Sequence, residues 1–437
     1  MAHTQSRARQ GTWWLQFPAP LRELALLRLV GSIGAGGVLY LTPLVFHQQA
    51  FTASSVTLGV ALAALAGTAG RLISGLLLDR GLNCSLPVLL AVLSALAGDS
   101  HLFGATAFPG YLQGQLLLGL AMGLYWPAIE LAVPLSCGGA VAPVPPEERA
   151  FPSARGYALA RSADAAGIAT GALVGALLAS GGWLRGIYVV DMGCLVVMAM
   201  LLLLRPLPNP HRTASGTRPT PWGRWLRPLL PLLAITLLAT ALPALMQSAL
   251  PLDLVRGGLE RQALPQSVGA LLIGLQLGLL VLLQWPVGQA LARRPVAQGL
   301  GLSLLCFALG TALLAGSALL SQGVVLVVLA QLPLALGQAA FLPIATEAVI
   351  EVTPSEHQGL AMALFSQCFA LSAFSAPLLA GRALDSHGHG SVLWLAMSAL
   401  CLLGLPLLRQ LGGQLGGQLG GRGGSGGSGA AADAQPR

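Results

Sequence analysis

The sequence has little charge and no lysine. Only 9% of its 437 residues are charged, and all 23 of its basic residues are arginine, whereas roughly a quarter of the residues in a soluble domain are charged. A water-soluble fold of this length needs more charge to cover its surface, so the composition argues against one. No basic block is interleaved with aromatic residues, which argues against a nucleic-acid surface.

The sequence also lacks the usual signatures of metal and nucleotide sites. Its six cysteines are widely spaced, without a C-x-x-C pair or a histidine at metal-ligand spacing, and we predict that they pack as small apolar residues. No G-x-x-x-x-G-K-[ST] loop is present to bind a phosphate, so direct use of ATP is not expected. His387 and His389 lie in a Gly-rich turn, which is more typical of a solvated turn than of a metal site. We predict no cofactor and no metal.

Long apolar runs dominate the sequence, of which 55% is hydrophobic. Each run is long enough to cross the roughly 30 Å of hydrocarbon in a bilayer as a helix of about 20 residues, and none alternates as a barrel strand does. Apolar length, Gly and Pro breaks and charged flanks predict twelve helices, at 24–46, 53–78, 86–107, 111–133, 157–180, 186–205, 229–251, 267–290, 296–319, 323–347, 358–381 and 391–409.

The arginines predict the orientation of these helices. An even number of spans puts both termini on one side, and with the N-terminus inside, the outer connections hold only Arg185, Arg256, Arg261 and Arg382. By the positive-inside rule, we predict a multi-pass protein of the cytoplasmic (inner) membrane with both termini cytoplasmic. The first apolar run is too long for a signal peptide and is predicted to be the first retained span.

The spans divide into two sets of six. We predict a cytoplasmic N-terminal segment at 1–23, a six-helix bundle at 24–205, a basic cytoplasmic linker at 206–228, a second six-helix bundle at 229–409 and a disordered Gly-rich tail at 410–437.

The two sets carry similar motifs at matching places. Gly75-Leu-Leu-Leu-Asp79-Arg80 follows span two, and Gly288-Gln-Ala-Leu-Ala-Arg293 follows span eight. Span four contains Gly123-Leu-Tyr125-Trp126-Pro127 with Glu130 beyond it, and span ten contains Gln338-Ala-Ala-Phe-Leu-Pro343 with Glu347 beyond it. Arg155-Gly and Gln358-Gly open the helices that follow. The chain therefore contains an internal repeat.

These parallel features resemble the major facilitator superfamily of secondary transporters, whose two six-span halves are related by an axis along the membrane normal. The resemblance implies an all-α membrane protein with twelve transmembrane helices in two pseudo-symmetric six-helix bundles. It also implies that Asp79 belongs to a conformational latch, although an ordinary loop acid in a helix cap is the alternative. We predict gating roles for the residues at the matching helix ends: Gly75, Asp79, Arg80, Glu130, Arg155, Gly288, Arg293 and Glu347.

Other family motifs match in part. In span four, Gln115 replaces the arginine that precedes the family's glycine pattern, so that residue's proton-linked role is not carried over. In span five, Gly167, Gly171 and Gly175 resemble the drug-antiporter motif without its proline. Glycines four residues apart form a flat helix face that suits either a rocking interface or a static bundle.

Ionisable residues inside spans are costly, by about 2.5–3.5 kcal/mol for a charge at the bilayer centre, and are therefore candidates for a transport pathway. Arg28, Arg161, Asp164 and Asp191 are these candidates. Arg161 and Asp164 stand three residues apart, where helical side chains can pair, and Asp164 is our first choice for the coupling residue. Asp99 with His101 is discounted, because span three is peripheral in relatives.

The remaining polar residues in the spans are mostly amides, which are expected to face the bundle interior. Together with the charged candidates they give the predicted substrate and ion pathway: Arg28, Gln115, Tyr125, Trp126, Arg161, Asp164, Gln247, Gln276, Gln338 and Gln367. Such a lining suits a neutral or amphipathic solute, but hydrogen bonds between helices explain about half of the amides equally well.

The predicted function is secondary transport of a small organic solute by alternating access, as proton-coupled export, by a monomer in contact with lipid. An uptake permease or a facilitative uniporter is the alternative within transport. A membrane-embedded enzyme and a non-transporting receptor or scaffold are the alternatives of other classes. An enzyme requires a cluster of His, Asp or Glu at one membrane face, and the seven histidines are dispersed.

Overall fold

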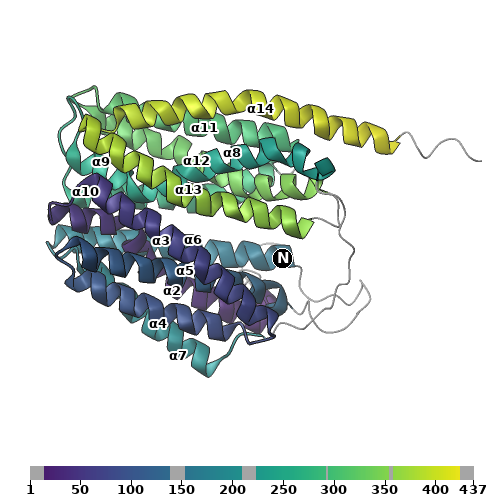
Figure 1. Ribbon diagram of the computed structural model, residues 1–437, viewed down its shortest axis with the longest axis horizontal. Coiled ribbons are helices and arrows are strands. Elements are labelled where there is room, and N and C mark those ends of the chain that lie inside the picture. Colours follow the sequence, from purple (N-terminus) through teal and green to yellow (C-terminus); the bar gives the residue numbers. More distant parts are fainter. Residues whose placement is uncertain (1–13, 138–152, 209–222, 292–293, 354–357, 424–437) are drawn as a thin grey trace, which may run out of the picture.

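Helices make up most of the chain in the computed structural model, which describes residues 14–137, 153–208, 223–291, 294–353 and 358–423 (Figure 1). A short 3-10 helix, η1 (Trp14–Gln16), precedes the first long helix. The α-helices are α2 (Ala19–Gln48), α3 (Ala53–Asp79), α4 (Ser85–Gly104), α5 (Phe108–Ser136), α6 (Ser153–Ser180), α7 (Gly186–Leu204), α8 (Gly223–Ser248), α9 (Leu250–Arg256), α10 (Gln266–Leu291), α11 (Val296–Ser317), α12 (Gly323–Val352), α13 (Gln358–His387) and α14 (Ser391–Gly423).

All the helices except the short α9 are long and apolar enough to cross a membrane, which gives 12 candidate spans in the described residues. The predicted fold class is therefore confirmed. The helices extend past the predicted ends wherever backbone hydrogen bonding continues beyond the apolar run: α2 begins at Ala19 and α13 ends at His387. In the predicted Gly-rich tail, α14 continues to Gly423.

The two halves pack their helices in the same pattern. In the N-terminal half, α2 packs on α6, α3 and α4 pack on α5, and α7 packs on α4. In the C-terminal half, α8 packs on α13, α10 and α11 pack on α12, and α14 packs on α11. The halves meet along α3 with α13 and along α6 with α10. The internal repeat in the sequence thus corresponds to two helical bundles of the same arrangement.

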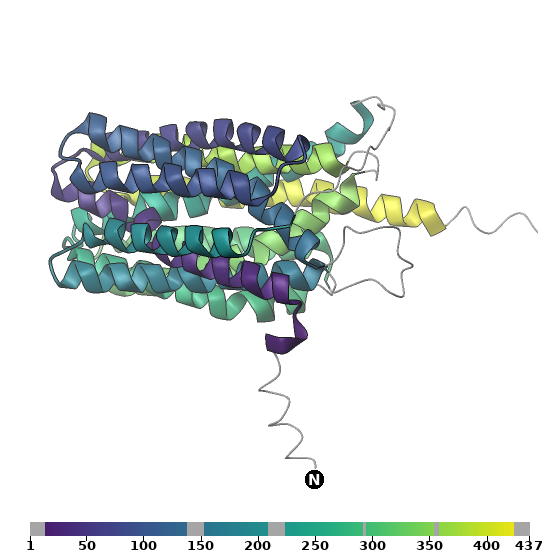
Figure 2. The same cartoon turned by 90° about the horizontal axis from the view of Figure 1, so that it is seen from below.

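Both ends of the described chain lie at the same end of the molecule, which we call the terminal face (Figures 1 and 2). The other end, the opposite face, carries the connections at 49–52, 105–107, 181–185, 257–265, 318–322 and 388–390. Helices α2 and α6 run from the terminal face to the opposite face, and α5 runs back.

The glycine face predicted in span five packs inside the N-terminal half. A Cβ added to Gly171 would lie 2.0 Å from the carbonyl oxygen of Ile33 on α2, and one added to Gly167 would lie 2.6 Å from that of Leu29. The helix backbones are therefore in direct contact, and only glycine fits there. Of the two uses considered for this face, tight packing within one bundle is the one observed.

Candidate functional site

Arg28 on α2 lies at the centre of a charge network between three helices of the N-terminal half. Its side chain is fully buried. Its Nε lies 3.0 and 3.1 Å from the two carboxylate oxygens of Asp164 on α6, and its Nη2 lies 3.0 Å from Oε1 of Glu130 on α5. Arg28 Nη2 also bonds to Asp164 Oδ2. We call Arg28, Glu130, Asp164 and Arg161, whose Nη2 lies 3.5 Å from Glu130, the Arg28 cluster.

The composition of this cluster follows from the cost of burying charge. A guanidinium out of water is stable only with opposite charge and hydrogen bonds around it, and the two arginines and two acids are formally neutral together. Ser32, one turn further along α2, donates a hydrogen bond of 3.2 Å to Asp164 Oδ1. Asp164 is therefore held from one side by Ser32 and from the other by Arg28.

Aromatic residues close the network on the side of α5. The guanidinium carbon of Arg28 lies 5.5 Å from the ring centroid of Trp126, a cation–π contact. Trp126 in turn stacks edge-on against Tyr125 at 5.4 Å between centroids. Tyr157 of α6 donates a 3.3 Å hydrogen bond to the backbone carbonyl of Glu130. These contacts keep the ion pair away from bulk water, where it would be weakened.

The predicted pairing of Arg161 with Asp164 was wrong. The two residues are neighbours by helical spacing, but the partner that Arg161 has in the structure is Glu130. The reason is burial: Arg28 has no access to water, so it must take the nearest carboxylates, whereas Arg161 is 46% exposed and is partly solvated.

One donor of the cluster remains available. Within the described residues, the buried Nη1 of Arg28 has no hydrogen-bond partner. The guanidinium is a planar fork that suits carboxylates and other planar acceptors. The site therefore contains a buried carboxylate, a fixed cation and an unused N–H donor on that cation, at the place where three helices meet.

The predicted amides lie apart from this cluster. Gln115 and Gln276 are buried, and Oε1 of Gln276 has no partner in the described part of the chain. Gln247 on α8 lies beside the hydroxyl of Tyr40 on α2, so it joins the two halves. Gln338 is half-buried and Gln367 is exposed.

The predicted gating glycines face open space in this conformation. No atom lies within 4 Å of a Cβ added to Gly75 or to Gly288, at matching places near the terminal face. Arg80 and Arg155 are exposed. The side chains of Asp79 and Glu347, and the whole of Arg293, lie outside the described residues.

The polar contacts between the halves lie at the opposite face. Asp385, near the end of α13, accepts hydrogen bonds of 3.1 and 2.7 Å from the backbone N–H groups of Ala53 and Ser54 at the start of α3. A carboxylate there satisfies unpaired amides and the positive end of the helix dipole. Beside it, a Cβ added to Gly381 would lie 1.8 Å from Oγ1 of Thr57, so α13 and α3 touch. Gln48 bonds to Gln266 across the halves as well.

A second network in the C-terminal half supports this contact. Arg256 of α9 pairs with Asp385 at 2.7 Å. The short helix α9 is itself fixed by buried Asp253, which accepts hydrogen bonds from the backbone N–H of Gly390 at 2.8 Å and Nε1 of Trp394 at 3.0 Å, and pairs with buried Arg261 at 3.3 Å.

Sequence reasoning missed Asp253 and Asp385 as functional residues. Asp385 lies beyond the predicted end of span eleven, in what was taken for a loop. The sequence signal that was available is Thr52 with Ser55, which marks the start of α3 and hence a site for a capping acid. Nothing in the sequence places Asp385 next to that start.

No family model matches the chain, and no curated protein matches it. Solved structures do. A POT family transporter in complex with 5-aminolevulinic acid is similar over 91% of this chain and 97% of its own, with 11% identity and a TM-score of 0.75. The peptide transporter POT in complex with sulfate covers 91% of this chain and 95% of its own, with 14% identity and a TM-score of 0.68. The nucleoside transporter NupG covers 90% of this chain and 99% of its own, with 14% identity and a TM-score of 0.68. At these identities the likeness establishes the fold, which is that of the major facilitator superfamily.

Proposed function

We propose that the chain is a secondary transporter that moves a small organic solute across a membrane by alternating access, with protons as the coupling ion and Asp164 as the proton carrier. The observation that carries the proposal is the buried ion pair between Arg28 and Asp164, which stands beside an unused N–H donor in a two-bundle transporter fold. Ion pairs at such a place are expensive and usually belong to a pathway.

The chemistry of the pair explains how a proton and a solute are linked. When Asp164 takes up a proton, its carboxyl group becomes neutral and its attraction to Arg28 falls. Arg28 then keeps only Glu130 as a charged partner, and the buried donors that faced Asp164 need a new acceptor, because breaking a buried ion pair from one side costs about 3–5 kcal/mol. A carbonyl or carboxylate on the solute supplies that acceptor, so protonation of Asp164 favours binding of the solute at Arg28.

The contacts between halves support a conformational cycle. The Asp385 contact closes the opposite face, while Gly75 and Gly288 near the terminal face stand free of neighbours. This pattern fits a state that is open toward the terminal face. Rocking of the two bundles about the midplane then opens the opposite face at the expense of the Asp385 contact.

We further propose that the terminal face is cytoplasmic and that transport is outward. The first part is supported by the arginines, because the outer connections under this orientation hold few of them. The outward direction is proposed from the partial drug-antiporter motif of span five, which lacks the family's proline. The assay below measures direction as well as coupling.

The test is solute flux in proteoliposomes with and without an imposed pH gradient, using a panel of peptides, nucleosides and small amphipathic solutes. Wild type is compared with Asp164→Asn and with a matched control, Glu260→Gln, which removes an exposed acid of the opposite face. We expect the gradient to drive flux in wild type and in the control. In Asp164→Asn, the gradient-driven flux should fall at least tenfold, while solute exchange continues.

Two results would overturn this assignment. Equal gradient dependence in wild type and Asp164→Asn would remove Asp164 from coupling. Flux that ignores the gradient in every protein would identify a facilitative uniporter.

A further inference from the structure

A second group of acids lies outside the Arg28 cluster, where α4, α7 and α2 meet. Asp99 of α4 is fully buried and Asp191 of α7 is 4% exposed. Helices α4 and α7 pack on each other, and the two carboxyl groups are near enough to interact electrostatically. His101, two residues further along α4, is turned outward and exposed, so it is not the partner of Asp99.

Among the described residues, no cation pairs with these carboxyl groups, and almost no hydrogen-bond donor reaches them. Both oxygens of Asp99 and Oδ1 of Asp191 lack a hydrogen-bond partner among the residues that the structure describes. Arg185, which directly precedes α7, instead donates to the backbone carbonyls of Phe103 and Ala105 at the end of α4. A buried carboxylate without donors or counter-charge is among the most costly groups in a protein.

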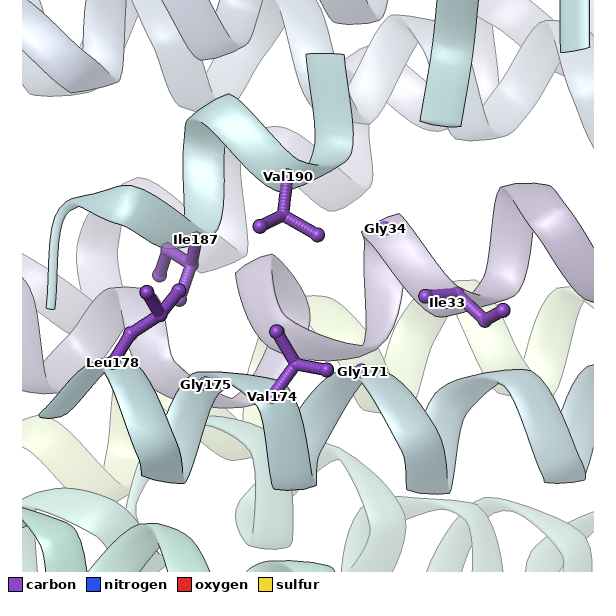
Figure 3. A pocket seen from close by; sticks show the side chains of 9 residues that line it. Ile33, Gly34, Gly171, Val174, Gly175, Leu178, Ile187 and Val190 are labelled. Atoms are coloured by element: carbon purple, nitrogen blue, oxygen red, sulfur yellow. The ribbon is translucent and has the colours of Figure 1, made fainter. Parts of the chain in front are cut away.

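The described residues around Asp191 supply no charge that would stabilise its carboxylate. On α2, Gly34 lies so close that an added Cβ would be 2.1 Å from Asp191 Oδ1. Gly34 also lines a narrow crevice between α2, α6 and α7, whose other walls are aliphatic, including Ile33, Ile187 and Val190 (Figure 3). The titratable neighbours on α7 are Cys194, whose thiol lies near the Gly34 backbone, and Tyr188.

Two adjacent carboxyl groups in a dry site cannot both carry charge, since like charges repel strongly there. One proton removes most of the repulsion and supplies the missing donor, because a protonated carboxyl donates its O–H to the other carboxylate. We propose that Asp99 and Asp191 form a second proton-binding site, in which the two carboxyl groups share one proton.

The site lies against α2, the helix that carries Arg28. Asp191 presses on Gly34, and Gly34 is six residues from Arg28 on α2, about 9 Å along the helix axis at 1.5 Å per residue. Loss of the shared proton would leave two charges between α4 and α7 and push Asp191 against bare α2 backbone. The site therefore links a proton to the packing of the helix that carries Arg28.

The test is infrared spectroscopy of the purified protein near neutral pH, which detects the C=O stretch of a protonated carboxyl group and assigns it by its shift in deuterated water. Wild type, the double variant Asp99→Asn with Asp191→Asn, and Asp164→Asn are compared, with size-exclusion profiles as the check on folding. We expect the band in wild type and in Asp164→Asn, where the pair is intact, and its loss in the double variant. Asparagine keeps the shape of a protonated aspartate, so the double variant should fold.

A second measurement separates a proton from an alkali cation. The thermal midpoint of wild type is recorded in sodium, potassium and choline chloride at one ionic strength. No difference among the salts supports a proton. A midpoint that rises with sodium or potassium, and that loses this response in the double variant, would overturn the proposal, as would an infrared band that the double variant retains. Neither measurement depends on solute flux, so this inference and the proposed transport function fail separately.

Discussion

The two halves share one helical arrangement but bury their charges at different depths. Among the described residues, the charges buried in the N-terminal half are Arg28, Asp99, Asp164 and Asp191, all within membrane-spanning helices. Those buried in the C-terminal half are Asp253 and Arg261, which lie in α9 and the connection after it, at the opposite face. Deeper in the C-terminal half, the buried polar groups are hydroxyls and amides.

Under the proposed function, this difference gives the two halves separate tasks. Ionisable groups inside the bundle respond to protons, so the N-terminal half contains the groups that can couple transport to a gradient. The charges of the C-terminal half hold α9 and Asp385 in place against α3, so they set how the halves close. Variants in each half should therefore fail in different ways.

The largest expected effect is at Arg28. Arg28→Met removes the buried cation and leaves the buried Asp164 without its ion-pair partner, while Glu130 keeps Arg161. Breaking a buried ion pair from one side costs about 3–5 kcal/mol, and we expect the free energy of unfolding of the purified protein to fall by about that amount. Adding Asp164→Asn to this variant should recover part of the loss, because the uncompensated charge is then gone.

The control lies in the same half. Arg205 pairs with Glu23, but both side chains are well exposed, at 66% and 37%. Arg205→Met should therefore cost less than about 1 kcal/mol. If the two methionine variants unfold alike, the Arg28 cluster is not a buried network, and the contrast between the halves disappears.

A smaller effect is expected at Asp385, where the halves touch. Asp385→Asn keeps an acceptor for α3 but loses the charge that attracts the helix start and Arg256. A loss of about 1.5 kcal/mol, the lower end of the range for hydrogen bonds to charged groups, changes the ratio of closed to open states roughly tenfold. Spin labels at Gln49 and Leu259, exposed residues of the two halves at the opposite face, report the distance between them.

We expect Asp385→Asn to add a longer distance to the distribution, while the exposed acid variant Glu260→Gln leaves it unchanged. A distribution that does not respond to Asp385→Asn would mean that the contact follows closure without stabilising it. The same variant should leave the pH dependence of flux intact, which distinguishes it from Asp164→Asn.

The fold was predictable because hydropathy and length act locally. All twelve spans were located from apolar runs, and the repeat was visible in the motifs around Gly75 and Gly288. The ends were less predictable, since continued backbone hydrogen bonding extended α2 back to Ala19 and α13 forward to His387. These extensions depend on a few residues that hydropathy does not weigh.

The site was predictable as a set of residues and not as a set of partners. Arg28, Arg161 and Asp164 were named from the cost of charge in a membrane, and Glu130 was named from its place in the internal repeat. Their pairing depends on α2 packing against α6, a long-range contact that spacing within one helix cannot reveal. For the same reason, Asp99 was considered with His101 on its own helix and not with Asp191 on α7.

The smallest expected effect concerns the uncharged polar groups buried in the interior of the C-terminal half. Ser372 of α13 is buried and hydrogen-bonds both to Oγ1 of Thr240 and to the Leu237 carbonyl on α8, at 2.7 Å each. Hydrogen bonds between membrane helices average only about 0.6 kcal/mol, so Ser372→Ala should lower stability by roughly that amount and leave coupling unchanged. Ser375, one turn away, bonds only within its own helix, to Leu371.

Ser375→Ala is therefore the matched control and should have no measurable effect on the thermal midpoint. The informative outcome is the pH dependence of flux in the Ser372 variant. If it changes, a neutral hydroxyl of the C-terminal half takes part in coupling, and the division of tasks between the halves is wrong. If it does not, the hydroxyls serve packing alone, because a neutral group has no charge state for a proton gradient to act on.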